Sequence, residues 1–206
     1  MKGYVLLSGG PDSSTLASEL AKTREIVCLY INFGQPYLER ELTSARAIAT
    51  NLQVPLEEIV VPSISHYFVG LGEFGHVILR EIIEISYGMA SAYARFNGGK
   101  VLYHANIAED VDDLPGLAEF FPTLQHAVNL MPGGQDFKIE SPYINVRKAE
   151  VFERAFELNV PLELTWSCLR PGQLHCGTCR SCKRRMQAFV GADITDSTQY
   201  ITKSAI

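Results

Sequence analysis

The clearest chemical potential lies near the N-terminus, where an apolar run ends in two glycines and several hydroxyl side chains. The residues concerned are Ser8, Gly9, Gly10, Asp12, Ser13, Ser14 and Thr15. A strand, a tight glycine turn and a helix N-terminus form a cradle for phosphate, because free backbone N–H groups and the helix dipole both favour an anion. Asp12 can hold a Mg²⁺ ion that bridges phosphate oxygens. The segment therefore predicts a phosphate site; the alternative, a turn with an ordinary serine or aspartate cap, needs neither two glycines nor so many hydroxyls.

A second cluster contains four of the five cysteines, namely Cys168, Cys176, Cys179 and Cys182. In a chain expected to lie in the cytoplasm, such a cluster indicates a metal site rather than disulfides. Four thiolates on short loops can surround Zn²⁺ tetrahedrally and leave no open coordination position, so we expect a structural zinc ion. An iron–sulfur cluster is the alternative.

The neighbours of the cysteine cluster leave further alternatives open. His175 is a further potential ligand, which we expect to lie beside the metal rather than on it. The basic residues at 180–185 either face a polyanion or form a solvated helix face, and we prefer the solvated face. The remaining cysteine, Cys28, lies in an apolar run and is expected to be a buried core residue.

The bulk composition limits the classes of function. A length of 206 residues suits one domain with a small appendage, and we expect a nucleotide-binding part at 1–163 and a helical, zinc-binding appendage at 164–206 packed on it. The hydrophobic content of 47% is that of a soluble globular protein. A net charge of −5 makes nucleic acid an improbable partner. The sequence shows neither a signal-peptide pattern nor an apolar run long enough to span a bilayer, so we expect a cytoplasmic protein without a membrane partner.

Apolar runs and helical patterns alternate along the chain. The expected strands are at 4–7, 25–31, 56–61, 100–105 and 139–143, and the expected helices are at 15–21, 38–52, 78–96, 119–130 and 148–158. Pro122 leaves the start of the fourth helix open. The alternation predicts a doubly wound α/β fold, with a parallel sheet covered on both faces by helices. Ligands of such sheets bind beyond the carboxyl ends of the strands, where the Ser8 segment lies.

The glycines at 70–75 match the dinucleotide fingerprint GxGxxG. The context of this match is wrong, because the segment before it is a poor buried strand and no acidic residue follows at the expected distance. We therefore expect a flexible loop at the mouth of a pocket rather than a nicotinamide or flavin site.

Several segments together resemble one family. The run SGGPDSS at 8–14 resembles the SGGxDSS signature of the PP-loop ATP pyrophosphatases, and CGTCRSC at 176–182 matches the pattern CGxCxxC. In combination, they are similar to the 7-cyano-7-deazaguanine synthase family, called QueC, and the similarity runs along almost the whole chain. Further segments that resemble the family patterns DYGQ, KAE, LTWSC and DPTxY are at 32–35, 148–150, 164–168 and 196–200.

The resemblance implies a PP-loop fold with a zinc appendage, usually in a homodimer, and a reaction that uses ATP and Mg²⁺. In that family a 7-carboxy-7-deazaguanine carboxylate attacks the ATP α-phosphate, ammonia displaces AMP to give an amide, and a second adenylation with elimination gives the nitrile. ATP contacts are implied for the Ser8–Thr15 segment and for Gln35, with Asp12 binding Mg²⁺. Lys148 begins a helix and either reaches the phosphates or is an exposed surface lysine.

The segments expected to face the substrate depart from the family pattern. Arg80 is what remains of the family stretch PGRN, and Asp110 and Pro115 are what remain of a loop similar to DYSGYPDC. The later aspartate and cysteine of that loop are Gly116 and Leu117 here. A carboxylate at this place could pair with the amino edge of a guanine-like base, so its loss affects recognition of a deazapurine substrate.

The substrate-binding candidates are therefore Arg80, Glu109 and Asp110. The acids Glu109, Asp112 and Asp113 either replace the lost carboxylate or are ordinary solvated loop acids.

Three hypotheses compete with a nitrile-forming ligase. A sister enzyme would keep the adenylation but use another acceptor or amine, or stop at the amide. A tRNA-thiolating enzyme would need a basic RNA surface, against which the acidic balance argues. A zinc-stabilised nucleotide-binding partner protein would have no catalytic role.

Overall fold

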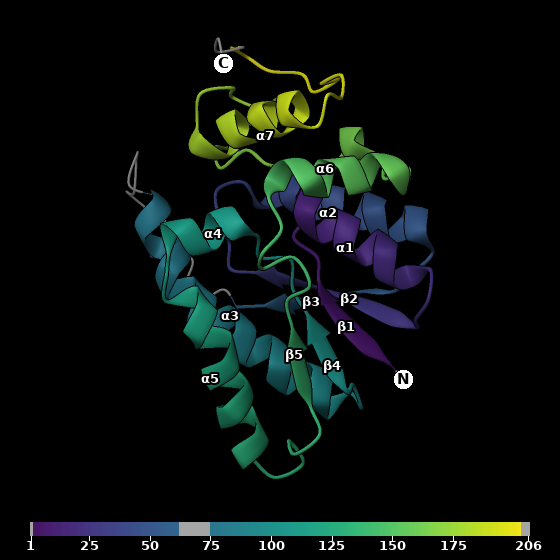
Figure 1. Ribbon diagram of the computed structural model, residues 1–206, viewed down its shortest axis with the longest axis vertical. Coiled ribbons are helices and arrows are strands. Elements are labelled where there is room, and N and C mark those ends of the chain that lie inside the picture. Colours follow the sequence, from purple (N-terminus) through teal and green to yellow (C-terminus); the bar gives the residue numbers. More distant parts are fainter. Residues whose placement is uncertain (1, 62–74, 203–206) are drawn as a thin grey trace.

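Five parallel strands form one sheet in the order β3-β2-β1-β4-β5 (Figure 1). The computed structural model describes residues 2–61 and 75–202, with the backbone alone described at 75–82. The strands are β1 (Gly3–Leu6), β2 (Ile26–Asn32), β3 (Leu56–Val60), β4 (Val101–Tyr103) and β5 (Lys138–Glu140). The helices are α1 (Pro11–Ala21), α2 (Leu38–Leu52), α3 (Gly75–Phe96), α4 (Ala108–Asp113), α5 (Leu117–Leu130), α6 (Lys148–Glu157), the 3-10 turn η3 (Leu162–Leu164) and α7 (Arg180–Gly191).

The sheet has its topological switch point between β1 and β4. The chain runs outward from β1 through β2 to β3, and then crosses to the other side of β1 for β4 and β5. Gly3 pairs with Ile26 of β2 on one side and with Val101 of β4 on the other. Since all the strands are parallel, their carboxyl ends meet at one edge, and the Ser8 turn follows β1 at the switch point.

Both faces of the sheet are buried, which explains the nearly continuous apolar runs of β1 and β2. Val5 and Tyr103 face the core that α1 and α2 cover, while Tyr4 and Leu102 face the core beneath α3 and α5. Cys28 is fully buried in β2, as predicted.

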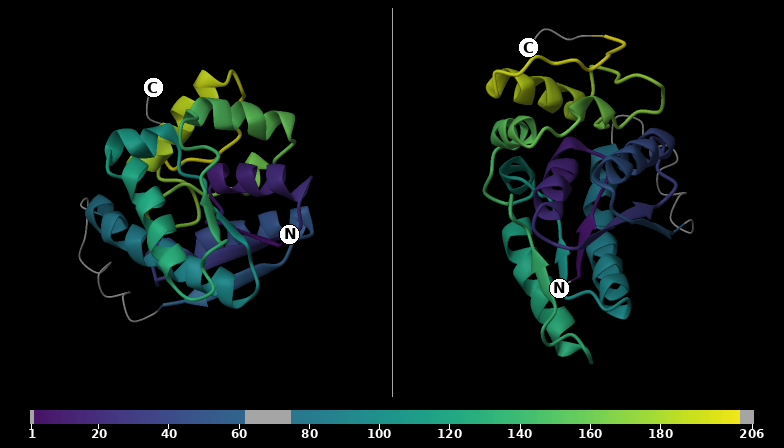
Figure 2. Two further views of the ribbon diagram at one scale, coloured as in Figure 1. Left: turned by 60° about the horizontal axis from the view of Figure 1, so that its bottom comes forward. Right: turned by 90° about the vertical axis from the view of Figure 1, so that its right-hand side faces the viewer.

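The C-terminal helix forms an additional layer. α7 packs on α6, which in turn packs on α1, and both views in Figure 2 agree with this order. The rings of Phe152 in α6 and Phe189 in α7 pack edge to face, with their centroids 4.8 Å apart, in an apolar cluster separate from the sheet cores. The cysteine-bearing segment is therefore attached to the sheet domain through α6.

The predicted strands and helices are confirmed, with differences at some boundaries. α1 begins at Pro11 rather than at residue 15, because proline suits the first position of a helix. α5 begins at Leu117 and continues through Pro122. Of the run at 110–117, interpreted as a loop, residues 110–113 belong to the short helix α4 and Leu117 begins α5. Most of the glycine fingerprint at 70–75 lies outside the described residues. Among the helices that are described, none has the length and apolarity to cross a membrane.

The turn after β1 depends on Gly9. Its φ of +76° lies in the left-handed region, and a Cβ there would lie 2.5 Å from the Glu41 carbonyl oxygen and 2.7 Å from the Ala45 nitrogen. Both atoms belong to the backbone of α2, so they cannot move aside as a flexible side chain would. The turn is thus wedged against α2.

We expect Gly9→Ala to lower the free energy of unfolding by about 3 kcal/mol or more, from left-handed strain plus overpacking. Urea unfolding measures it. Gly88→Ala is the matched control, because Gly88 lies within α3 with no atom within 4 Å of its added Cβ. That variant should be neutral or slightly stabilising. A Gly9→Ala protein as stable as the wild type would contradict the strained geometry.

Candidate active site and metal centre

The Ser8–Ser13 turn is held by its own hydroxyl groups. The Ser13 hydroxyl oxygen lies 3.1 Å from that of Ser8, accepts from the Ser8 N–H at 3.2 Å and donates to the Gly10 carbonyl at 3.2 Å. The backbone N–H of Trp166 donates to the Gly9 carbonyl at 2.8 Å. These bonds fix the shape of the turn from both sides.

The N-terminus of α1 has no side-chain cap. Its N-cap residue is Gly10, which offers no side-chain oxygen to the first-turn N–H groups. The first backbone bond of the helix runs from the Ser14 N–H to the Gly10 carbonyl at 3.0 Å. The interpretation as an ordinary capped turn is therefore wrong, and the helix end is free to bind an anion.

The predicted phosphate residues divide into two groups. Ser8, Gly10, Asp12, Ser13 and Gln35 line a cavity of about 340 Å³ at the carboxyl edge of the sheet. Gly9, Ser14 and Thr15 do not line it. Because α1 begins early, Ser14 and Thr15 lie on its buried face, where the Thr15 hydroxyl donates to the Pro11 carbonyl at 2.8 Å.

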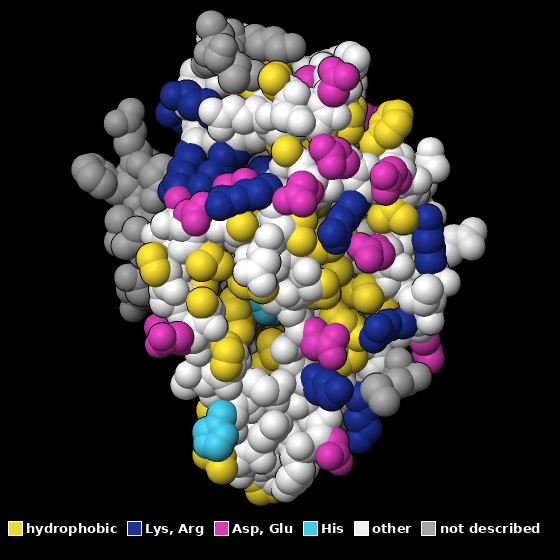
Figure 3. Space-filling model, viewed as in Figure 1, with side chains coloured by type: hydrophobic (Ala, Val, Ile, Leu, Met, Phe, Trp, Pro, Cys, Tyr) yellow, Lys and Arg dark blue, Asp and Glu magenta, His cyan; other side chains and the backbone are white. Residues whose placement is uncertain are grey.

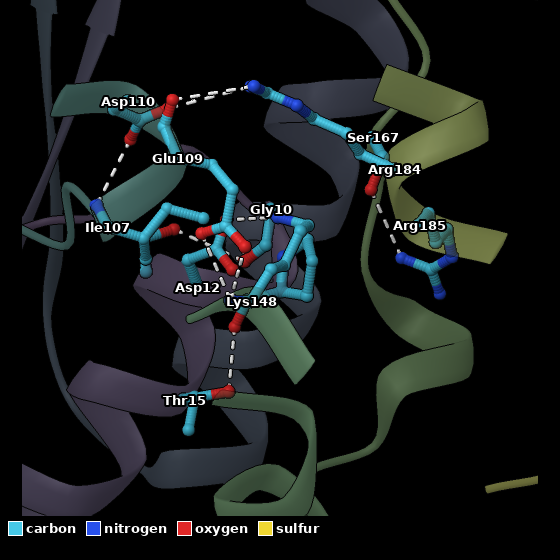
Figure 4. Close-up of polar contacts among 12 residues, drawn as sticks. Gly10, Asp12, Thr15, Ile107, Glu109, Asp110, Lys148, Ser167, Arg184 and Arg185 are labelled. Carbon is cyan, nitrogen blue, oxygen red and sulfur yellow. Dashed lines mark hydrogen bonds and ion pairs between the residues drawn. The ribbon is translucent and has the colours of Figure 1, made fainter. Parts of the chain in front are cut away.

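Asp12 and Lys148 meet beside this helix end. Lys148 Nζ lies 2.5 Å from Asp12 Oδ2, and the two side chains are 13% and 21% exposed (Figure 4). Lys148 is thus not an exposed surface lysine. The other oxygen, Asp12 Oδ1, is buried without a hydrogen-bond partner among the described residues. A carboxylate oxygen left unpaired next to a phosphate cradle suits a divalent cation, and the residues therefore fit Mg²⁺.

Glu109 does not line the cavity but supports Lys148. Both of its carboxylate oxygens accept from the Lys148 backbone N–H at 3.1 Å, which caps the N-terminus of α6. A carboxylate at this end of a helix is also favoured by the helix dipole. Glu109 therefore sets the start of the helix that presents the Lys148 side chain.

On the β4 side of the turn, the cavity is lined by a hydrogen-bonded group that the sequence reasoning missed. Asn106 follows β4, and its Oδ1 accepts from the Tyr87 hydroxyl and lies 2.9 Å from His104 Nδ1. Burial lowers the pKa of His104 to about 3, so the imidazole is neutral. Asn106 Nδ2 donates to Asp110 at 3.4 Å. A polar residue directly after a parallel strand was the signal that could have identified Asn106.

Asp110 is the predicted substrate residue that lines the cavity. Its Oδ2 accepts from the Ile107 N–H at 3.1 Å, which closes the first turn of α4. Burial raises the pKa of Asp110 despite that bond. Asp112 and Asp113 do not line the cavity, and the Arg80 side chain lies outside the described part of the chain.

On the β2 side, the cavity is lined by a second buried network. The Tyr30 hydroxyl and Gln35 Nε2 donate to Glu41 Oε2 at 2.8 and 2.7 Å, and Gln35 Oε1 accepts from the Phe33 N–H at 3.0 Å. Burial raises the pKa of Glu41 to about 7, although both donors act in the opposite direction. Gln35 was predicted to lie here, while Tyr30 and Glu41 were not.

The four cysteine sulfurs lie within 4.8 Å of one another. Cys176 Sγ and Cys182 Sγ are 3.9 Å apart, close to the tetrahedral edge of about 3.8 Å that Zn–S bonds of 2.3 Å would give. Backbone N–H groups donate to three of the sulfurs, including that of Cys168, which favours the thiolate forms. The cluster therefore fits a metal ion held by four sulfurs.

His175 lies beside the cluster, as expected. Its Nε2 accepts from the Ser167 N–H at 3.1 Å, and its ring packs on Trp166 with centroids 4.2 Å apart.

The prediction of a solvated face for the basic run at 180–185 holds for Arg180 and Lys183, which are exposed, but is wrong for Arg185. Arg185 is 1% exposed and donates to the Thr165 and Thr198 hydroxyls, each at 2.8 Å. Arg180 and Arg184 form ion pairs with acids of α4. Lys183 is exposed and, unlike Arg180, has no ion pair with α4 among the described residues.

Known proteins resemble this chain over nearly its whole length. The model of the family described as "Queuosine biosynthesis protein QueC" matches residues 2–69 and 75–193. The chain belongs to the QueC family. QueC relatives named 7-cyano-7-deazaguanine synthase, from a Nitratiruptor species and from Campylobacter hominis, are 32% and 31% identical. The alignments cover 97% and 98% of this chain and 99% and 100% of theirs.

Solved structures support the PP-loop fold. U34-tRNA thiolase NcsA from Methanococcus maripaludis has a TM-score of 0.52 and 17% identity over 78% of this chain and 58% of that one. NMN synthetase from Francisella tularensis has a TM-score of 0.50 and 16% identity, over 95% of this chain and 78% of that one. At such identities the likeness concerns the fold alone, and the doubly wound prediction is confirmed.

Glu41 should make the stability of the protein depend on pH. Its folded-state pKa of about 7 exceeds the ordinary value of 4.5, so folding favours the protonated form. This contribution is present in full below about pH 4.5 and is lost as the pH rises through 7. Relative to that of Glu41→Gln, the free energy of unfolding of the wild type should fall by about 3 kcal/mol between pH 4 and 8.

Urea unfolding at a series of pH values measures this difference. Glu39→Gln, at an exposed position of the same helix, is the control for the removal of a charge alone. Parallel pH curves for the wild type and Glu41→Gln would contradict the assignment.

Proposed function

We propose that this protein is an ATP-dependent ligase that converts 7-carboxy-7-deazaguanine and ammonia into 7-cyano-7-deazaguanine. The observation that carries the proposal is the uncapped N-terminus of α1, which lines a cavity that extends to both sides of it together with Asp12. Lys148 does not line the cavity but pairs with Asp12 beside it. A nucleotide on one side and an acceptor acid on the other would meet at the phosphates. The names of the QueC relatives support this acceptor.

The phosphates would lie on the turn. Backbone N–H groups of α1 and the hydroxyls of Ser8 and Ser13 would hold the pyrophosphate as it leaves, while Lys148 would place a positive charge near it. Mg²⁺ bound at Asp12 would supply charge neutralisation on the phosphate oxygens. Gln35 is proposed as a nucleotide contact on the β2 side. No protein nucleophile is required, because positioning brings the acceptor oxygen to the α-phosphorus.

The proposed reaction consists of two successive adenylations, each of which uses one ATP. A carboxylate oxygen attacks the α-phosphorus and pyrophosphate leaves; ammonia then attacks the acyl carbon, and AMP leaves as a proton is lost. The amide oxygen next attacks the α-phosphorus of a second ATP and pyrophosphate leaves; loss of AMP and of the two amide protons then gives the nitrile.

The acceptor would lie on the β4 side, where aromatic and polar groups meet. Tyr87 offers an aromatic wall, and Asp110 offers a carboxylate for the amino edge of the base, in the run where Gly116 replaces the family aspartate. Arg80 remains a proposed substrate contact. Glu109 is proposed to act through Lys148 rather than on the substrate.

We expect AMP, pyrophosphate and the nitrile when the protein is incubated with the acid, ATP, Mg²⁺ and ammonium, with products resolved by mass. Asp12→Asn and Lys148→Met should each lower AMP formation by about a hundredfold or more. Lys22→Met is the control, because Lys22 is exposed at the opposite end of α1. Absence of AMP with this acid would overturn the proposal, whereas an amide as the final product would favour the sister enzyme.

We further propose that 164–206 is a zinc-binding appendage on a nucleotide-binding domain at 1–163. Metal analysis should then give about one zinc per chain, in a colourless protein. Cys182→Ser should lose the metal and lower the melting temperature, whereas Cys28→Ser should keep the metal, since Cys28 lies in β2. Bound iron with visible absorption would contradict zinc. A homodimer is also proposed, on the family resemblance.

A further inference from the structure

Helix α4 carries four acids, each of which meets a partner outside the helix. Asp113 pairs with Arg180 and lies 2.7 Å from Arg184 Nη2, and Asp112 pairs with Arg147. Glu109 caps α6. Figure 3 shows basic and acidic side chains gathered where α4 meets α7.

The residues of α4 itself are held mainly by polar contacts, although the N-cap residue before them, Ile107, is buried in the apolar core. α4 has six residues, and none of them is fully buried. A helix this short is not stable by itself, so its position depends on tertiary contacts. The contacts that the structure gives α4 on the side of the metal-binding segment are ion pairs and hydrogen bonds from α7.

Arg184 makes the most central of these contacts. Besides its ion pair with Asp113, it lies 3.9 Å from Asp110 Oδ1 and donates to the Glu109 carbonyl at 3.4 Å. Figure 4 shows its side chain reaching from α7 to Asp110 and Glu109. The side chain is 25% exposed, compared with 45% for Arg180, so its charge is better shielded from solvent. Arg184 does not line the cavity, so it acts through the residues of α4.

Two neighbouring residues in the first turn of α4, Glu109 and Asp110, lead to the groups of the proposed active site. Asp110 lines the cavity on the acceptor side. Glu109 holds the backbone of Lys148, whose Nζ reaches Asp12. A displacement of α4 would therefore move the acceptor carboxylate and the phosphate lysine together.

We infer that Arg184 is a positioning residue that ties the cysteine-bearing segment to the active site by fixing α4. The effect of Arg184 on the reaction rests on the proposed function, whereas its effect on the position of α4 rests on the fold alone. The metal-binding segment then has a second role, because α7 both stabilises the chain and sets the place of Asp110 and Lys148. The basic run at 180–185 thereby has an internal partner, the acidic helix.

Arg184→Gln should lower kcat/KM for the acid by about tenfold, through a higher KM and a lower kcat. A change of this size is expected for residues in one ion-pair network. The KM for ATP should rise less than the KM for the acid, because Lys148 is one of several groups proposed to hold the phosphates and the hydrogen bonds within the Ser8–Ser13 turn are unaffected. Arg184→Lys should restore part of the loss. Arg147→Gln is the matched control: it also removes an arginine paired with α4, but that pair is more than half exposed and Asp112 does not line the cavity.

Hydrogen exchange tests the same inference without any substrate. In Arg184→Gln the amides at 108–113 and 147–150 should exchange faster, while those of α1 and β1 stay unchanged. Asp113→Asn should act in the same way, and the double variant should be less affected than the sum of the two.

Unchanged exchange and kinetics in Arg184→Gln would overturn the inference, as would a loss equal to that in Arg147→Gln. Faster exchange in a protein that does not use the acid would uphold the positioning and refute the proposed function instead.

Discussion

The uncapped N-terminus of α1 is the feature on which the rest of the site depends. A helix leaves its first N–H groups without partners inside the helix, and a side chain at the N-cap usually accepts from one of them. Here the N-cap is Gly10, and Gly9 turns the chain in a conformation that only glycine adopts without strain. The wedge of Gly9 against α2 keeps this end open, so that a phosphate can take the place of the missing cap.

Other parts of the molecule surround that helix end and complete it. α6 brings Lys148 to Asp12, and the Trp166 N–H holds the Gly9 carbonyl from the segment that leads to the cysteines. Because α7 packs on α6, the cysteine-bearing segment lies close to the Ser8–Ser13 turn rather than at a distance from it. The cysteine cluster and the site are therefore parts of one assembly, joined by both packing and charge.

The two sides of the cavity differ in their chemistry. On the β2 side, Glu41 holds two donors and has a pKa near neutral pH, while on the β4 side a neutral His104 and Asn106 form an uncharged network that leads to Asp110. Strand ends and glycine turns could be predicted from the sequence, since local patterns indicate them. Tyr30, Glu41, Tyr87 and His104 could not, because each lies in an ordinary strand or helix pattern and reaches the cavity only through the packing of separate elements.

The amino-acid sequence was sufficient to predict the doubly wound fold, the glycine turn after β1, the cysteine cluster and the resemblance to QueC. These features are encoded locally, in hydrophobic periodicity and in short motifs whose spacing has a chemical purpose. Only the folded chain shows that Ser14 and Thr15 face the core and that Lys148 meets Asp12. It also shows that Arg180 and Arg184 pair with α4 and that Arg185 is buried. The reason is that partners in ion pairs and cavities lie far apart in the chain: Asp12 and Lys148 are separated by 136 positions. The order of the strands and the packing of α6 and α7 are what bring such residues together.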